Sequence, residues 1–151
     1  MNKEAIEKLH ADLLTSWNKQ DADGMASLFD LNGSTIGFDG SQMNGQMQIK
    51  TELDKVFGDH KTASYVWKVE EVRFLNSETS LLRARVGMVP PGKKEINPPT
   101  NAIQSMVAIL KNGVWKIALF QNTPAQFHGR PEMVEKMTAK LNKLVTPQAK
   151  Q

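Results

Sequence analysis

The sequence contains no cysteine, which excludes a disulfide scaffold, a thiolate nucleophile and any zinc or iron–sulfur site with cysteine ligands. It also lacks any run of the roughly 18–20 apolar residues that a membrane-crossing helix requires. Residues 1–10 are charged and broken, without the apolar segment of a secretory signal. No phosphate-binding glycine loop, dinucleotide motif or nucleophile elbow is present. We therefore expect a cytoplasmic protein that contacts no membrane and carries no cofactor.

Positive charge is in small excess only: 19 Lys and Arg stand against 16 Asp and Glu, which gives a formal net charge of +3. This excess is well below that of a dedicated nucleic-acid-binding protein, so no nucleic-acid partner is expected. The lysines near the C-terminus (Lys136, Lys140 and Lys143) lack interleaved aromatic residues and predict a solvated helix face. The chain of 151 residues, 40% of them hydrophobic, suits one globular domain over residues 1–151.

Helical spacing dominates the first half of the chain. The apolar residues of the first segment fall on one helical face: Ile6, Leu9, Leu13, Leu14 and Trp17. Asp21 or Asp23 is expected to cap a second, short helix. The elements expected after this cap are the short helix through Leu28 and Phe29, a turn at 31–33, a strand over 34–38, a hairpin-like stretch over 39–45 and a helix over 46–57.

The second half of the chain is rich in β-branched and aromatic residues, separated by turn signals. Asn112–Gly113 between two apolar runs is the strongest hairpin signal in the chain. Strands are expected over residues 64–75, 80–89, 102–110 and 114–121, followed by a C-terminal helical extension at about 131–146. Helices followed by antiparallel strands predict an α+β fold, in which a curved antiparallel sheet wraps around the N-terminal helix as a cone open at one end.

The order of these elements resembles the nuclear transport factor 2-like superfamily, with its cystatin-like cone. The resemblance extends from about Ile6 to Glu132 and rests on Trp17, Leu28–Phe29, Asp39–Gly40, Gly45 and residues 113–117 (GVWKI). Residues 121–132 (QNTPAQFHGRPE) resemble the signature of the SgcJ/EcaC group, which is related to SnoaL-like proteins. The resemblance implies a small-molecule site in the cone. The superfamily includes isomerases, cyclases and dehydratases, and also non-catalytic ligand-binding or dimerisation domains.

Two positions carry the acid–base hypotheses. Asp39 follows the first strand, close to where the resemblance to ketosteroid isomerase-like relatives places a general-base carboxylate; alternatively, Asp39–Gly40 is only a turn pair. His60, beside Asp59, is a second candidate acid–base group or a surface residue. Gln46 departs from the family, whose members often have Arg or His at that position, so no charge-based role is expected there.

Polar residues within apolar strands need hydrogen-bonding partners, and Gln104 and Asn122 are in this position. Alternation along the last strand predicts one face with Ala118, Phe120 and Asn122 and an opposite face with Ile117, Leu119 and Gln121. In a cavity their amides would orient a ligand carbonyl; alternatively, Asn122 only anchors the chain before Pro124. Aromatic and methionine side chains either pack in the core or line a pocket for a flat apolar ligand. The predicted ligand-binding residues are Trp17, Tyr65, Trp67, Met88, Gln104, Phe120 and Asn122. The three histidines (His10, His60 and His128) have no metal-ligand spacing, so no metal site is expected, and His128 is expected to shape its turn.

Apolar residues on both strand faces (Ile103, Val107 and Ile109 on one of them) predict a homodimer through the outer face of the sheet. Arg83 and Arg85 are expected at that interface or on a solvated face, near Glu70 or Glu71. Two functions remain open: a domain that binds a small, largely apolar molecule, with or without proton-transfer chemistry, and a non-catalytic interaction module whose cone is filled by its own side chains. A filled cone, with no pocket larger than about 300 Å³, would favour the second function, and a ligand bound in the cone would favour the first.

Overall fold

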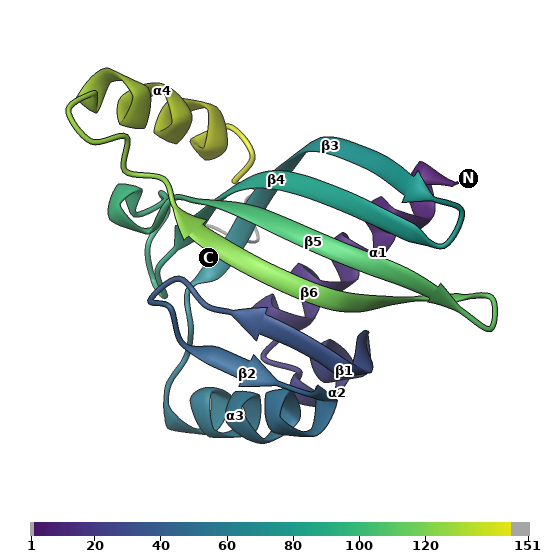
Figure 1. Cartoon of the computed structure of the whole chain (residues 1–151). Coiled ribbons are helices and arrows are strands. Elements are labelled where there is room, and N and C mark those ends of the chain that lie inside the picture. The colour runs from purple at the N-terminus through teal and green to yellow at the C-terminus, as the bar shows by residue number, and fades with distance from the viewer. Residues whose placement is uncertain (1, 146–151) are drawn as a thin grey trace.

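A computed structural model describes residues 2–145 and has the expected α+β architecture, with helix α1 lying across one face of a curved sheet (Figure 1). The helices are α1 (Lys3–Asn18), α2 (Ala22–Ala26), α3 (Gln46–Asp59), the 3₁₀ helix η1 (Pro98–Thr100) and α4 (Pro131–Asn142). The strands are β1 (Phe29–Ile36), β2 (Gln42–Asn44), β3 (Ser64–Asn76), β4 (Thr79–Val89), β5 (Ala102–Lys111) and β6 (Val114–Pro124).

The six strands form one sheet in the order β2-β1-β6-β5-β4-β3. Neighbouring strands are antiparallel except for β1 and β6, which run parallel. The long hairpins of the second half therefore form the body of the sheet, and the first strand joins it beside the last one. This arrangement brings the ends of β1 and β6 together next to α3.

Strand β1 begins earlier than the sequence predicts. The short helix α2 ends at Ala26, and Phe29, which is fully buried, already lies in the strand. The predicted turn at 31–33 is wrong, because these residues belong to β1 at a shift in its register with β6. A Cβ atom on Gly33 would lie 2.5 Å from the carbonyl oxygen of Ile117. Gly33 is thus required by the close approach of β6, and not by a turn.

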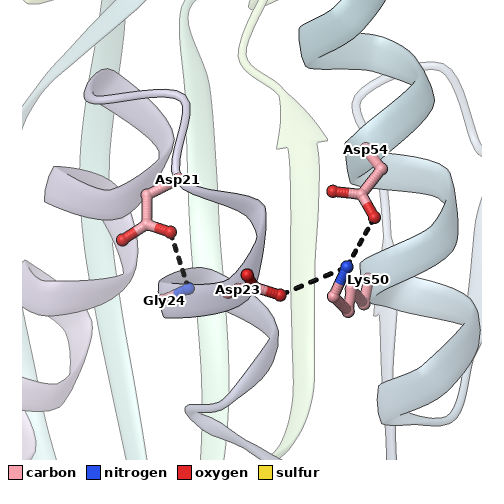
Figure 2. A network of polar contacts seen from close by, with 5 residues as sticks. All are labelled: Asp21, Asp23, Gly24, Lys50 and Asp54. Carbon is pink, nitrogen blue, oxygen red and sulfur yellow. Dashed lines mark hydrogen bonds and ion pairs between the residues drawn. The ribbon is translucent and has the colours of Figure 1, made fainter.

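Polar contacts fix α2 against α3 (Figure 2). Asp21 is the N-cap of α2, since its carboxylate accepts a hydrogen bond from the Gly24 N–H at 2.9 Å. The Lys50 ammonium on α3 lies 3.2 Å from the Asp23 carboxylate and 2.6 Å from that of Asp54. Such exposed ion pairs stabilise a fold weakly. Their position matters more, because they connect the short helix to the helix that forms one wall of the cavity described below.

A β-bulge changes the predicted facing of β6. Val107 pairs with Leu119 and Ala108 pairs with Ile117, so Ala118 has no partner in the β5 register. Ile117 is consequently fully buried on the same side as Phe120. The simple alternation that places Ile117 on the outer face and Ala118 on the inner face is therefore wrong.

Helix α4 covers one end of the outer face of the sheet. Its buried Met137 and Leu141 pack in a second core with Val66 and Val89. A Cβ atom on Gly87 would lie 2.9 Å from the Ile96 side chain, so only glycine permits this packing without a shift. The predicted helical extension ends at Asn142 among the described residues, and its last position, 146, lies outside them. Within residues 2–145, no helix is long and apolar enough to cross a membrane.

Candidate functional site: a cavity at the open end of the cone

A cavity of about 730 Å³ lies between α1, α3, the loop after β1 and the ends of β3, β4 and β6. Most of its wall is apolar: Trp17, Met25, Phe38, Met43, Leu53, Val56, Met88 and Phe120. The polar and small residues of its lining are Thr35, Gly37, Asp39, Ser41, Gln42, Gln48, Glu52, Tyr65 and Asn122. The volume lies in the range of small-molecule sites, which are typically about 300–1,000 Å³.

The residues predicted from the sequence divide into two groups. Those that line the cavity are Trp17, Asp39, Tyr65, Met88, Phe120 and Asn122. Gln104 is fully buried behind Asn122, and Trp67 packs edge-on against the ring of His10, with 6.3 Å between the ring centroids. His60 does not line the cavity; it is exposed beside the Asp59 carboxylate, at 3.1 Å.

Hydrogen bonds to β3 hold the aromatic wall in place. The indole N–H of Trp17 donates to the Ala63 carbonyl at 2.8 Å, and the Asn18 carboxamide both accepts from and donates to the backbone of Tyr65. The Trp17 ring lies 5.3 Å from that of Phe57 and 5.7 Å from that of Tyr65, measured between centroids. The C-terminal turn of α1 is thereby attached to the start of β3, and the rings of Trp17 and Tyr65, with Phe57 packed against Trp17, form a preformed part of the wall.

A chain of buried side chains ends at the cavity. His10 Nε2 lies 2.8 Å from Gln104 Oε1, and Gln104 Nε2 donates to Asn122 Oδ1 at 3.0 Å. Gln104 and Asn122 are register partners on β5 and β6, and His10 reaches them from α1. Sequence reasoning missed His10 as a member of this site. The signal was its place among Ile6, Leu13 and other buried residues of α1, where a polar ring needs a partner.

The donor and acceptor roles within the hydrogen-bonded series His10, Gln104 and Asn122 determine whether Asn122 presents a donor or an acceptor to the cavity. Gln104 Oε1 is an acceptor, so the partner nitrogen of a neutral His10 must carry the proton. The opposite polarity would put the imidazole proton on His10 Nδ1, which is buried and has no hydrogen-bonding partner in the described structure. An unpaired buried N–H is the costlier arrangement. Asn122 therefore accepts from Gln104 through Oδ1, and its Nδ2 group is the donor at the cavity wall.

The hydroxyl of Tyr65 is the second polar group close to Gln104. Burial raises the pKa of Tyr65 to about 12, and a side-chain hydrogen bond with Gln104 opposes part of that rise. The phenol therefore stays protonated at every physiological pH. Tyr65 and Asn122 both line the cavity, so its inner end is neutral and offers hydrogen-bond donors.

Asp39 occupies an exposed turn at the cavity. Its carboxylate accepts a hydrogen bond from the Ser41 N–H at 2.9 Å, and Gly40 follows with a φ of +90°. Hydrogen bonds from Ser41 hold the pKa of Asp39 below its usual value. A general base is expected to have a raised pKa, so this environment stabilises the anion instead of preparing it for proton abstraction.

Other predicted positions serve the framework. Arg83 lies 2.7 Å from the Glu71 carboxylate and Arg85 lies 2.9 Å from that of Glu70, on the outer face of the sheet. Gln46 donates through Nε2 to the Phe29 carbonyl at 2.8 Å and so attaches α3 to β1. His128 is exposed in the turn before α4. Among residues 2–145, no group of three His, Asp or Glu side chains gathers as a metal site would require.

Lowering the pH should reduce the free energy of unfolding, because the imidazole of His10 is buried. Burial lowers the pKa of His10 below 6.5, although the hydrogen bond with Gln104 opposes part of this effect. The unfolded chain then binds a proton more readily than the native one, so stability is complete above pH 6.5 and falls below it. We expect the free energy of unfolding to decrease by up to about 1.4 kcal/mol per pH unit there, and His10→Gln to flatten this slope. Urea unfolding at pH 7.5 and 5.5 measures this change in the free energy of unfolding, with His60→Gln, at an exposed histidine, as control. The same pH dependence in wild type, His10→Gln and His60→Gln would contradict the assignment of the effect to His10.

No family model matches the chain, and no curated protein matches it either. Solved structures do match. A domain of unknown function with a cystatin-like fold from Nostoc punctiforme aligns with a TM-score of 0.78 at 23% identity, over 89% of this chain and 83% of the other. An NTF-2-like protein of unknown function from Shewanella oneidensis aligns with a TM-score of 0.67 at 15% identity, over 82% and 99%.

A third similar structure is a ketosteroid isomerase-like protein from Erwinia carotovora atroseptica, with a TM-score of 0.64 and 16% identity over 83% of this chain and 99% of the other. At such identities the likeness concerns the fold and not the activity. The neighbours share the curved sheet around an N-terminal helix that the sequence predicts. The chain therefore has the cystatin-like fold of the nuclear transport factor 2-like proteins.

Proposed function

We propose that this domain binds a small, largely apolar molecule in the cavity and that Asn122 donates a hydrogen bond to a carbonyl-type acceptor on it. The proposal rests on one polar group, the amide nitrogen of Asn122, which has no partner among the described residues at the wall of the cavity. Asn122 is 8% exposed, and its Nδ2 group donates to no other group within residues 2–145, whereas its Oδ1 is paired with Gln104. Nδ2 is not one of the inaccessible polar atoms that lack a partner, so it is open to the cavity, where a ligand carbonyl would accept its hydrogen bond. Such a bond contributes about 0.5–1.5 kcal/mol net.

The resemblance of residues 121–132 to the SgcJ/EcaC and SnoaL-like proteins supports a small-molecule ligand, and one structural neighbour is described as ketosteroid isomerase-like. Proton transfer in an isomerisation or cyclisation would assign the base role to Asp39. The hydrogen bonds that lower the pKa of Asp39, together with its exposure, favour binding over this chemistry. Binding is thus the function that the site supports best.

The rival function is a non-catalytic interaction module with a filled cone. Such a module needs no internal volume, and a cavity of about 730 Å³ lined by half-buried aromatic side chains is a poor fit to it. The cavity also combines apolar and aromatic side chains with polar groups that can orient a ligand, as small-molecule sites do.

Blocking the cavity should abolish binding of an apolar dye. Nile red, which is neutral and fluoresces in apolar surroundings, is expected to bind the wild-type protein with 1:1 stoichiometry. Val56 lies on α3 and lines the cavity, so Val56→Trp should fill part of it and weaken Nile red binding at least about tenfold. Val114 is 52% exposed and outside the cavity, so Val114→Trp should leave the affinity unchanged. Equal binding by wild type and Val56→Trp would place the dye elsewhere and contradict the proposal.

The Asn122 donor can be tested with two ligands of the same shape. Acetophenone carries a carbonyl where α-methylstyrene carries C=CH₂, and each can compete with Nile red. Asn122→Leu should weaken acetophenone binding about tenfold, the value of one hydrogen bond of around 1.4 kcal/mol, and leave α-methylstyrene binding unchanged or tighter. Because Gln104 loses its acceptor, the variant is expected to lose about 1–3 kcal/mol of stability. The ratio of the two affinities within one variant is therefore the readout, and an unchanged ratio would exclude Asn122 as the donor.

We also propose that two copies pair through the part of the outer sheet face that carries Val107, Ile109 and Leu119. These side chains are only half-buried and lie side by side on neighbouring strands of the sheet. The same face carries both signs of charge, since Arg83 and Arg85 lie beside Glu71 and Glu70. A face with both signs is compatible with a second copy of itself across a two-fold axis.

Sedimentation at micromolar concentration should give about twice the chain mass of 16.9 kDa. Val107→Arg places an unpaired charge at the centre of the proposed interface and should yield a monomer that is still folded by circular dichroism. Val114→Arg, on an exposed site, should remain dimeric. A wild-type protein that sediments only as a monomer would refute the pairing.

A further inference from the structure

The charged side chains that line the cavity are of one sign. They are Asp39, in the loop after β1, and Glu52, on α3. No lysine or arginine of residues 2–145 lines it, although the chain as a whole has a formal net charge of +3. The cavity therefore has an electrostatic character opposite to that of the whole molecule.

These two carboxylates are only weakly neutralised by the protein. One Glu52 oxygen lies 3.5 Å from the Lys55 ammonium, whose side chain is 71% exposed, so solvent screens the pair. Asp39 takes part in no ion pair with another described residue, and its hydrogen bond comes from the neutral backbone N–H of Ser41. Both groups thus keep negative charge that is available to a ligand.

The inner end of the cavity differs from this outer part. There Asn122 is 8% exposed, its Nδ2 group donates to no other group in residues 2–145, and it belongs to the same lining as the carboxylates. The cavity consequently has a neutral donor at its buried end, apolar walls, and exposed acceptors with negative charge at its opening. A ligand that matches all three has an acceptor, an apolar body and a cationic end, in that order.

We propose that the cavity selects a cationic amphiphile, an organic amine whose apolar body fills the cavity and whose ammonium group lies at Asp39 and Glu52. This inference rests on the proposed binding function and specifies its ligand class. Organic anions such as carboxylates and phosphates are disfavoured, because they would place negative charge beside two carboxylates in a partly desolvated opening. A neutral alcohol takes an intermediate place, since it can donate a hydrogen bond but brings no charge.

A series of ligands with one body and three head groups tests the proposal. 4-Phenylbutylamine, 4-phenylbutan-1-ol and 4-phenylbutanoate compete with Nile red at pH 7.5 and low salt. We expect the amine to bind at least about tenfold more tightly than the carboxylate, with the alcohol between them, and added salt to narrow the difference. The same affinity for amine and carboxylate would overturn the inference, as would the reverse order.

Variants separate the charges at the opening from the total charge. Asp39→Asn combined with Glu52→Gln should remove the preference for the amine, so that the affinities for amine and carboxylate come within about twofold of each other. The matched control, Asp12→Asn with Glu135→Gln, changes the net charge by the same amount at residues outside the cavity and should retain the preference. A control that loses the preference as fully as the first variant would attribute it to total charge and overturn the inference.

The two proposals fail in distinguishable ways. If Nile red binds and Val56→Trp blocks it, but the three head groups compete equally, the binding function stands and the ligand class is wrong. If Val56→Trp has no effect on dye or competitors, the binding function itself is wrong and the head-group series no longer reports on the cavity.

Discussion

The hydrogen-bonding requirement of one buried amide organises the centre of this molecule. Gln104 is fully buried in β5, where its carboxamide would be strongly destabilising without partners. His10 of α1 and Asn122 of β6 provide them at 2.8 Å and 3.0 Å. The bond from His10 connects the helix to the concave face of the sheet in one orientation, because a rotation of α1 would leave the imidazole and Gln104 Oε1 unpaired; the bond to Asn122 joins β5 and β6. Apolar packing alone would not fix that orientation as strictly.

The hydrogen-bonded series of His10, Gln104 and Asn122 lies between a closed core and an open cavity. On one side of it, α1 packs its apolar residues against the sheet with no room for solvent, as the fully buried Leu13 and Met106 illustrate. On the other side lie the half-buried Trp17 and Tyr65, which line the cavity. The hydrogen-bonded side chains of His10, Gln104 and Asn122 thus end at the cavity, and Asn122 is both their last member and the polar group at the inner end of the cavity.

The sequence predicts most of the elements because periodicity and turn residues are local signals. The β4 alternation (Leu82, Ala84 and Val86 buried, Arg83 exposed) and the Asn112–Gly113 hairpin are found where expected. The failures concern contacts between distant segments. Gly33 suggests a turn, but the carbonyl of Ile117 explains it, and nothing near Ala118 indicates the bulge that turns Ile117 inward. The first depends on how β1 meets β6, which are far apart in sequence, and the second on a local shift in the register of β5 with β6.

For the site too, the sequence indicates which residues need partners but not which partners they find in the folded structure. A polar residue within an apolar strand announces a need for partners, which is why Gln104 and Asn122 could be selected from the sequence. Which partner each would find, and that His10 would be one of them, depends on the crossing of α1 over β5 and β6. Trp67 had the same composition-based signal as Trp17, yet it packs against His10 while Trp17 lines the cavity. Residue type identifies the candidates, and the curvature of the sheet determines which of them line the cavity and which pack in the core.

An open cavity also bears on the stability of the domain. Apolar side chains that face it gain less from burial than those in the closed core, at about 25 cal/mol for each Å² left in contact with water. The Trp17 indole donates to the Ala63 carbonyl, and the Tyr65 backbone is bonded to the Asn18 carboxamide, so the two residues are held in the wall and do not collapse inward to recover this energy. A bound apolar molecule would cover the same surface without a change in the fold. Rigid anchoring of the wall thus keeps the volume available, and the stabilisation forgone in the empty protein becomes part of the free energy of binding.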